Sequence, residues 1–120
     1  MVVAIERPQT EEDFKIWRLY VPLQTSSGLL FVEWRYEPRR FRIGGEEGVV
    51  LKAAGVERLI QALARKEPWA PGPLTWNPPI LLVGDRAFNL GKRGHLLLAR
   101  MLNQLLSEVK SLPSPVNGGE

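Results

Sequence analysis

Apolar and polar side chains alternate at a spacing of two through much of the first half of the chain, and this period predicts β-strands. Residues 14–23 are expected to form one strand. The later sequence LLFVEWRYEPRRFRI predicts two more, at residues 29–37 and 39–43, with a turn at Glu37-Pro38. Turn-forming residues at 24–28 separate the first strand from the second. The pattern therefore predicts an antiparallel sheet of consecutive strands.

The second half of the chain changes to the helical spacing of apolar residues. Residues 52–67 predict a helix that Pro68 ends, and residues 49–51 are either a short strand or the lead into this helix. One stripe of the helix carries Val56, Leu59, Ile60 and Leu63. Residues 95–112 predict a second, longer helix that is rich in leucine.

Between the two helices the sequence predicts a stiff loop followed by a hairpin. Residues 68–79 contain five prolines and are expected to be extended and irregular. This loop holds Trp69 and Trp76, which either anchor it on the core or form a wall against which bases stack. Residues 80–83 and 86–90 predict a hairpin with a two-residue turn.

These elements predict a single α+β domain over residues 14–112. Its expected architecture is an antiparallel sheet of four to five strands packed against helices, with a long Leu-rich C-terminal helix. Residues 1–13 are expected to be a polar leader and residues 113–120 a disordered tail. With no signal sequence, no apolar run of membrane length and no cysteine, a cytoplasmic protein without membrane partners is expected.

The last helix allows two interpretations. Leucines recur every seven residues, with a second apolar series four places on, which is the pattern of a coiled-coil seam. The seam predicts a homodimer interface at Leu98, Leu102, Leu105, Val109 and Leu112. The alternative is one broad core helix that lies across the sheet.

Charge and aromatic content favour a polyanionic partner. The first 13 residues carry a net charge of −3 and the remaining 107 carry +6, mostly as arginine. Aromatic rings and guanidinium groups alternate along the predicted strands, and such a surface binds single-stranded nucleic acid by base stacking and phosphate pairing. The predicted contacts are Trp34, Tyr36, Arg35, Arg39, Arg40, Arg42, Trp69, Trp76, Lys92 and Arg93.

Strand parity divides these residues between two faces. Trp34 and Tyr36 share one face, while Phe31 and Arg35 share the other, so if the first pair is core the second pair faces the ligand. The basic pair at residues 92–93, flanked by glycines before a helix, is either a phosphate nest or a solvated turn.

No catalytic chemistry is expected. His95 is the only histidine, which excludes a site built on several histidines, and capping, packing or facing a phosphate are its expected roles. Asp85 with Glu46 and Glu47 could form a carboxylate site, but Asp is favoured in hairpin turns for backbone reasons alone. The glycine-rich loop at 44–48 lacks the Lys-Ser/Thr of a phosphate-binding loop. Neither an enzyme, a metal nor a cofactor is therefore expected.

The order of predicted elements resembles that of the Thermo-DBP-like single-stranded DNA-binding proteins of hyperthermophilic archaea. The segments LLFVEWRYEPRRFRI and LLLARMLNQLLSEV carry this resemblance. It implies an archaeal, thermophilic source and self-association through the C-terminal helix. The layout is also similar to sheet-and-helix binders of the PC-four or Whirly kind, which implies the same ligand class.

The expected function is therefore binding of single-stranded DNA or RNA with little sequence preference, as a homodimer. The alternative is a protein-interaction module that docks through the C-terminal helix and the Trp-bearing loop.

Overall fold

The computed structural model describes residues 3–4, 18–36, 39–44 and 48–110. The predicted tail, the turn at residues 37–38 and most of the predicted leader lie outside these ranges. In chain order the elements are β1 (Val3–Ala4), β2 (Arg18–Thr25), β3 (Gly28–Arg35), β4 (Arg40–Ile43), β5 (Val49–Leu51), α2 (Ala53–Arg65), β6 (Leu74–Asn77), β7 (Ile80–Val83), β8 (Arg86–Asn89) and α3 (Gly94–Lys110).

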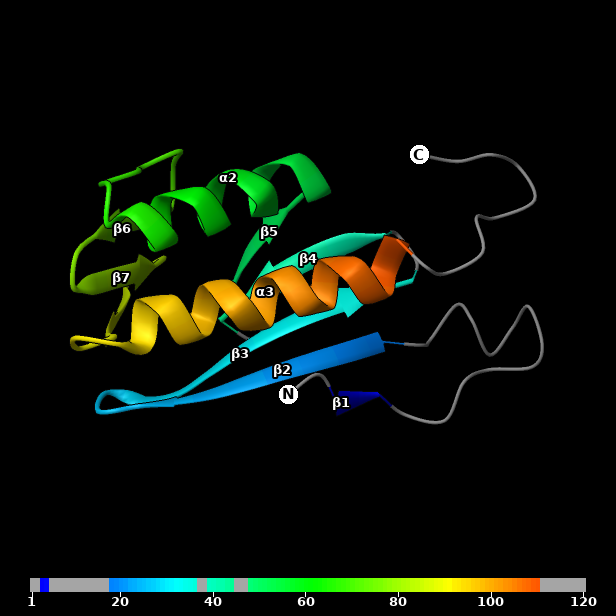
Figure 1. Ribbon diagram of the computed structural model, residues 1–120, viewed down its shortest axis with the longest axis horizontal. Helices are drawn as coiled ribbons and strands as arrows, with labels where there is room; N and C mark the ends of the chain where they lie inside the picture. The colour runs from blue at the N-terminus through cyan, green and yellow to red at the C-terminus, as the bar shows by residue number, and fades with distance from the viewer. Residues whose placement is uncertain (1–2, 5–17, 37–38, 45–47, 111–120) are drawn as a thin grey trace.

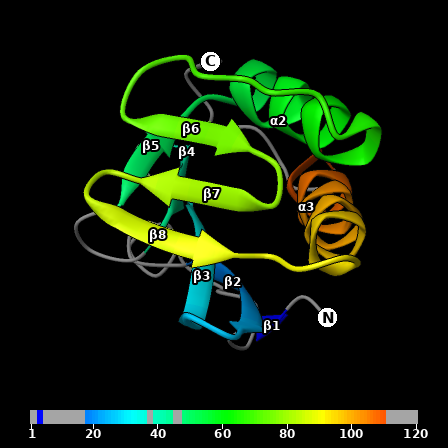
Figure 2. The same cartoon turned by 90° about the vertical axis from the view of Figure 1, so that its left-hand side faces the viewer.

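The architecture is α+β, as predicted. An antiparallel sheet in the order β1-β2-β3-β4-β5 forms one layer, and α2 and α3 lie side by side on one of its faces (Figure 1). A second antiparallel sheet, β6-β7-β8, lies at one end of these layers (Figure 2). The chain thus runs twice through a series of antiparallel strands followed by a helix.

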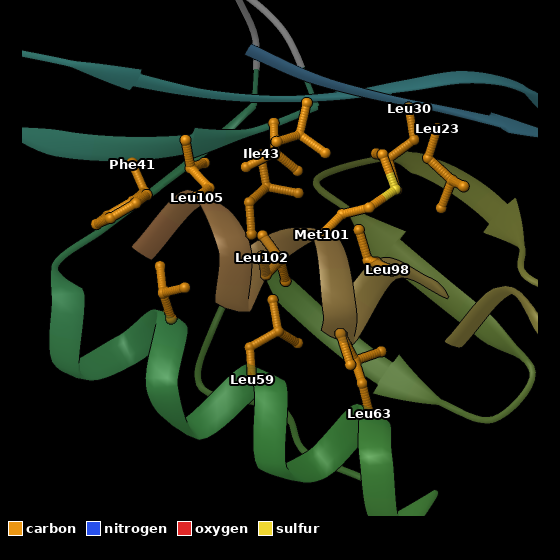
Figure 3. Close-up of a cluster of buried hydrophobic side chains, with 14 of the residues drawn as sticks. Leu23, Leu30, Phe41, Ile43, Leu59, Leu63, Leu98, Met101, Leu102 and Leu105 are labelled. Atoms are coloured by element: carbon orange, nitrogen blue, oxygen red, sulfur yellow. The ribbon is translucent and has the colours of Figure 1, made fainter. Parts of the chain in front are cut away.

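The core lies between the larger sheet and the two helices. Alternate residues of β2, β3 and β4 are buried on the helix side: Leu19, Val21, Leu23, Leu30, Val32, Trp34, Phe41 and Ile43. Figure 3 shows α3 inserted between these residues and α2, with Leu98, Leu102 and Leu105 among the side chains that fill the space. The residues that alternate with these along each strand point to the opposite face of the sheet.

The predicted coiled-coil seam is wrong at the four positions that the structure describes. Leu98, Leu102 and Leu105 are 0% exposed and Val109 is 8% exposed within the single chain. The broad apolar stripe exists because α3 contacts both the sheet and α2, and so must bury two sides. The alternative interpretation, one core helix across the sheet, is confirmed, while Leu112 lies outside the described residues.

The strand β6 was not expected, because its neighbourhood is rich in proline. All five prolines flank residues 74–77 and none lies between them, so each residue of β6 keeps its N–H for pairing. The flanking prolines contribute carbonyl groups instead: Pro73 accepts from Gly84 N–H and Pro79 accepts from Leu90 N–H, both at 2.9 Å. The predicted hairpin of β7 and β8 is confirmed.

Element boundaries shift by a few residues. β2 is described from Arg18 to Thr25, two residues beyond its predicted end, and the predicted start at residues 14–17 lies outside the described ranges. Val3 and Ala4, which belong to the predicted leader, pair with β2 as its outer neighbour. Residues 49–51 form a strand, and α2 follows with three of its four predicted stripe residues buried.

The two sheets meet closely at Gly44, just after β4. This glycine has a φ of 99°, and a Cβ there would lie 2.6 Å from Cγ1 of Val83 in β7. Only glycine fits such an approach. A further link joins the β2–β3 turn to β8, where the Asn89 N–H donates to Ser27 Oγ at 3.1 Å.

Candidate nucleic-acid interface

The face of the larger sheet that points away from α2 and α3 is called here the outer face. Among the described elements, neither a helix nor the second sheet covers it (Figures 1 and 2). Strand register places on it Tyr20, Pro22, Gln24, Leu29, Phe31, Glu33, Arg35, Arg40, Arg42 and Val50. It therefore mixes apolar, aromatic and basic side chains on one sheet surface.

The apolar part centres on Phe31 in the middle of β3. Its side chain is 40% exposed. Its neighbours on the face include Pro22, which lies opposite it on β2, and Leu29 of β3, which is 39% exposed. A half-exposed phenyl ring on a sheet presents a flat π-surface without the flexibility of a loop. Such a ring can stack on a nucleobase, which contributes about 1–3 kcal/mol per base.

The basic part lies toward the other end of β3. Arg35 stands opposite Arg40 on β4, and Arg42 stands between Glu33 and Val50 across the neighbouring strands. The Arg35 Nε donates to Glu33 Oε1 at 2.6 Å, and the carboxylate side chain is only 12% exposed. Three guanidinium groups therefore accompany a single carboxylate among the described residues of this face, which together carry excess positive charge.

Trp34 and Tyr36 do not belong to this face. The predicted stacking role is wrong for the buried Trp34 and stays a prediction for the half-buried Tyr36. Strand parity directs them to the helix side, where Trp34 is 1% exposed and Tyr36 packs against the core. Their rings meet edge to face, 5.8 Å apart at 87°. The guanidinium of Arg39 lies 5.4 Å and 5.1 Å from the two ring centres, so it packs over the rings and does not join the other arginines.

The tryptophans of the proline-rich segment anchor it to the core. Trp76 is 1% exposed, and its Nε1 donates to the Ala62 carbonyl of α2 at 3.2 Å. Trp69 is half-buried and exchanges two backbone hydrogen bonds with Trp76, at 2.9 and 2.7 Å. The predicted stacking wall is therefore wrong for Trp76, and the anchoring interpretation is confirmed.

Lys92 and Arg93 are exposed in the loop between β8 and α3. Figure 2 places this loop on the helix side of the larger sheet, so the structure does not bring the pair to the outer face. His95, one turn further, is 4% exposed, and its ring stacks on Trp76 at 6.4 Å and 23°. Of its three expected roles, packing is the one observed.

The buried position of the His95 ring affects its pKa. Burial, with a smaller contribution from the positive charge of Lys66, lowers the pKa of His95 below its ordinary value of 6.5. Its Nδ1 has no hydrogen-bond partner among the described residues. The imidazole is therefore held in the neutral form near neutral pH.

Several members of the outer face were missed by sequence reasoning, among them Tyr20, Pro22, Gln24, Leu29 and Val50. The parity rule that identified Phe31 and Arg35 as an alternative pair would have found Leu29 on the same strand. The others depend on cross-strand register, which a single sequence does not specify.

The other candidate chemistry is not assembled in the described residues. Asp85 is exposed in the β7–β8 turn, while Glu46 and Glu47 lie outside the described ranges. Within those ranges, His, Asp and Glu side chains form no group of three that could hold a metal ion. The described helices are also too short or too polar to cross a membrane.

The chain matches no protein-family model, no curated protein and no solved structure.

Proposed function

We propose that the chain binds single-stranded nucleic acid, DNA or RNA, across its outer face. The observation that carries this proposal is the half-exposed ring of Phe31 on an open sheet that also presents Arg35, Arg40 and Arg42. The ring stacks on a base, while the guanidinium groups pair with phosphates. Trp34 and Tyr36 support the sheet from behind.

The spacing of these groups sets the size of the ligand. Phe31 and Arg35 lie four residues apart on β3, a separation of about 13–14 Å along an extended strand. A short oligonucleotide that runs along β3 can contact both and also reach Arg40 and Arg42 on β4, so we propose this ligand over a mononucleotide. Because stacking and phosphate pairing do not read the edges of the bases, little sequence preference is expected.

Fluorescence anisotropy tests the proposal directly. Labelled oligo-dT, an RNA of the same length and a duplex are titrated with the protein at two salt concentrations. The single strands are expected to bind more tightly than the duplex. If three phosphates are neutralised, the log–log salt slope is about −2.

A matched pair of variants assigns the binding to the outer face. Phe31→Ala should weaken binding about tenfold, because it removes one stacking surface. Leu82→Ala is the control, since Leu82 is 38% exposed but belongs to the second sheet. No binding at low salt, or equal effects of the two variants, would contradict the proposal.

One observation favours the alternative, a protein-interaction function through α3. Leu96 and Leu97 are 50% and 45% exposed at the start of this helix, beside each other in sequence. A partner protein or a second copy of the chain could cover them. Sedimentation equilibrium of the wild type and Leu97→Gln tests the second copy: only a self-associating protein would lose mass on substitution.

A further inference from the structure

A groove of about 350 Å³ lies along the outer edge of β5, where the larger sheet ends. One wall is β5 itself with Gly48, and the other consists of Pro71, Pro73, Leu74 and Gly84. The volume is at the small end of the range for ligand pockets, which is about 300–1,000 Å³. Figure 2 shows β5 next to β6 and the β7–β8 turn, which carry or adjoin the residues that line the groove.

The backbone N–H and C=O of Val50 point outward from this edge of the sheet, toward the groove. Gly44 N–H donates to the Phe31 carbonyl at 2.8 Å, which makes Phe31 and Gly44 a hydrogen-bonded pair of β3 and β4. Hydrogen-bonded and non-bonded pairs alternate along antiparallel strands, so the backbone groups of Arg42 also face β3. Val50, opposite Arg42, must therefore turn its N–H and C=O away from β4.

The chemistry of the groove fits a nucleobase better than a phosphate. Its described lining is aliphatic side chains, prolines and glycines, with no charged side chain, and the carboxylate of Asp85 follows Gly84 directly. A base has apolar faces and an edge that both donates and accepts hydrogen bonds. Proline and valine can cover the faces, while the Val50 backbone offers one donor and one acceptor to the edge.

The groove also adjoins the outer face. Val50 lines the groove, is 49% exposed, and stands opposite Arg42 on the neighbouring strand. We propose that the groove holds one unstacked base of the single strand whose phosphates pair with the arginines of the outer face. This inference rests on the proposed function and adds a second base-binding position to it, beyond Phe31.

Amide hydrogen exchange on the wild-type protein is the first test. The Val50 amide is expected to exchange rapidly in the free protein and to slow at least fivefold when oligo-dT is bound. If the protein binds oligo-dT while this amide exchanges unchanged, the groove is empty and the inference is overturned. If the amide is already protected in the free protein, a protein segment occupies the edge, which also overturns it.

Two glycine variants provide the second test. Gly84 has a φ of 61°, in the left-handed region that asparagine tolerates better than most residues, and a Cβ there meets nothing within 4 Å. Gly84→Asn therefore adds a side chain to the groove wall without a steric clash, at a backbone strain that the control below shares. Gly91→Asn is the matched control, because Gly91 has a φ of 65° and equal space but lies before α3. Gly84→Asn should weaken oligo-dT binding about five- to tenfold and Gly91→Asn less than twofold.

The outcomes distinguish failure of the groove inference from failure of the proposed function. Equal affinities of the two variants, with tight binding of oligo-dT, would overturn the inference that the groove holds a base and leave the proposed function intact. A protein that gives no anisotropy change with any oligonucleotide would overturn both.

Discussion

The guanidinium of Arg39 lies over the indole of Trp34, 5.4 Å from the ring centre, on the helix side of the sheet. This arginine therefore stabilises the fold, while its neighbours Arg40 and Arg42 point to the outer face. Arg39 has a φ of 64°, in the left-handed region that asparagine tolerates. Arg39→Asn should lower the free energy of unfolding by about 1–2 kcal/mol through loss of the cation–π contacts.

Urea unfolding measures this loss, and oligo-dT binding provides the contrast. Arg42→Ala should weaken binding severalfold with little effect on stability, the reverse of the Arg39 variant. Arg39→Asn binding more weakly than Arg42→Ala would place Arg39 at the interface and contradict the assignment.

Glu33 is the described carboxylate of the outer face, held 2.6 Å from Arg35. In the proposed complex this carboxylate would compete with phosphate for the guanidinium and repel the nucleic-acid backbone. Glu33→Gln should therefore tighten oligo-dT binding about three- to tenfold at low salt, and less as salt screens the charge. The control is Glu57→Gln, which removes an equal charge from a pair with Lys110 on the helices. An unchanged affinity for Glu33→Gln would mean that phosphates do not approach this part of the sheet.

His95 makes the stability of the fold depend on pH. Because its pKa is lowered in the folded protein, the unfolded chain binds more protons at this ring once the pH falls toward 6.5. Its contribution to stability is therefore complete above that pH and is lost as the pH falls through 6.5 toward the folded pKa. Thermal unfolding from pH 8 to 5 should show a steeper decline for the wild type than for His95→Phe, which keeps an aromatic ring. Parallel profiles would show that this ring does not cause the decline.

Leu105 is fully buried between the sheet and α2, whereas Leu97 on the same helix is 45% exposed. Leu105→Ala should lower the free energy of unfolding by about 2–5 kcal/mol, as buried leucine truncations do. Leu97→Ala should lower it by less than about 1 kcal/mol. Urea unfolding compares the two. Equal losses of stability for the two variants would contradict the placement of Leu105 in the core.

Strand parity was read correctly from the sequence, but the choice of face was not. The alternation of residues 29–36 separates Trp34 from Phe31 without showing which of them the helices cover. The larger ring was assigned to the ligand, yet Trp34 fills more core volume than any other residue of β3 and is buried for that reason. Packing, which no local pattern specifies, decided between the two faces.

The period of α3 was likewise detected, while its partners were not. Leu98, Leu102 and Leu105 fit both a coiled-coil seam and an intramolecular core, and only the position of α2 separates the two interpretations. The groove at β5 could not be predicted from the sequence, because the placement of the second sheet brings Val50 and Pro71 together. β6 was missed because proline content was counted over the whole loop instead of residue by residue.

The position of α3 across β2 and β3 has a consequence for how the protein is made. A ribosome releases every strand of the larger sheet before it releases the helix that covers them. During that interval the leucines and valines of β2 and β3 lack their cover, because α2 packs against β4 and β5 while α3 packs against β2 and β3. Late chain growth therefore limits when the core can close. Nascent chains that stop before α3 should attract chaperones and proteases, and those that include it should escape them.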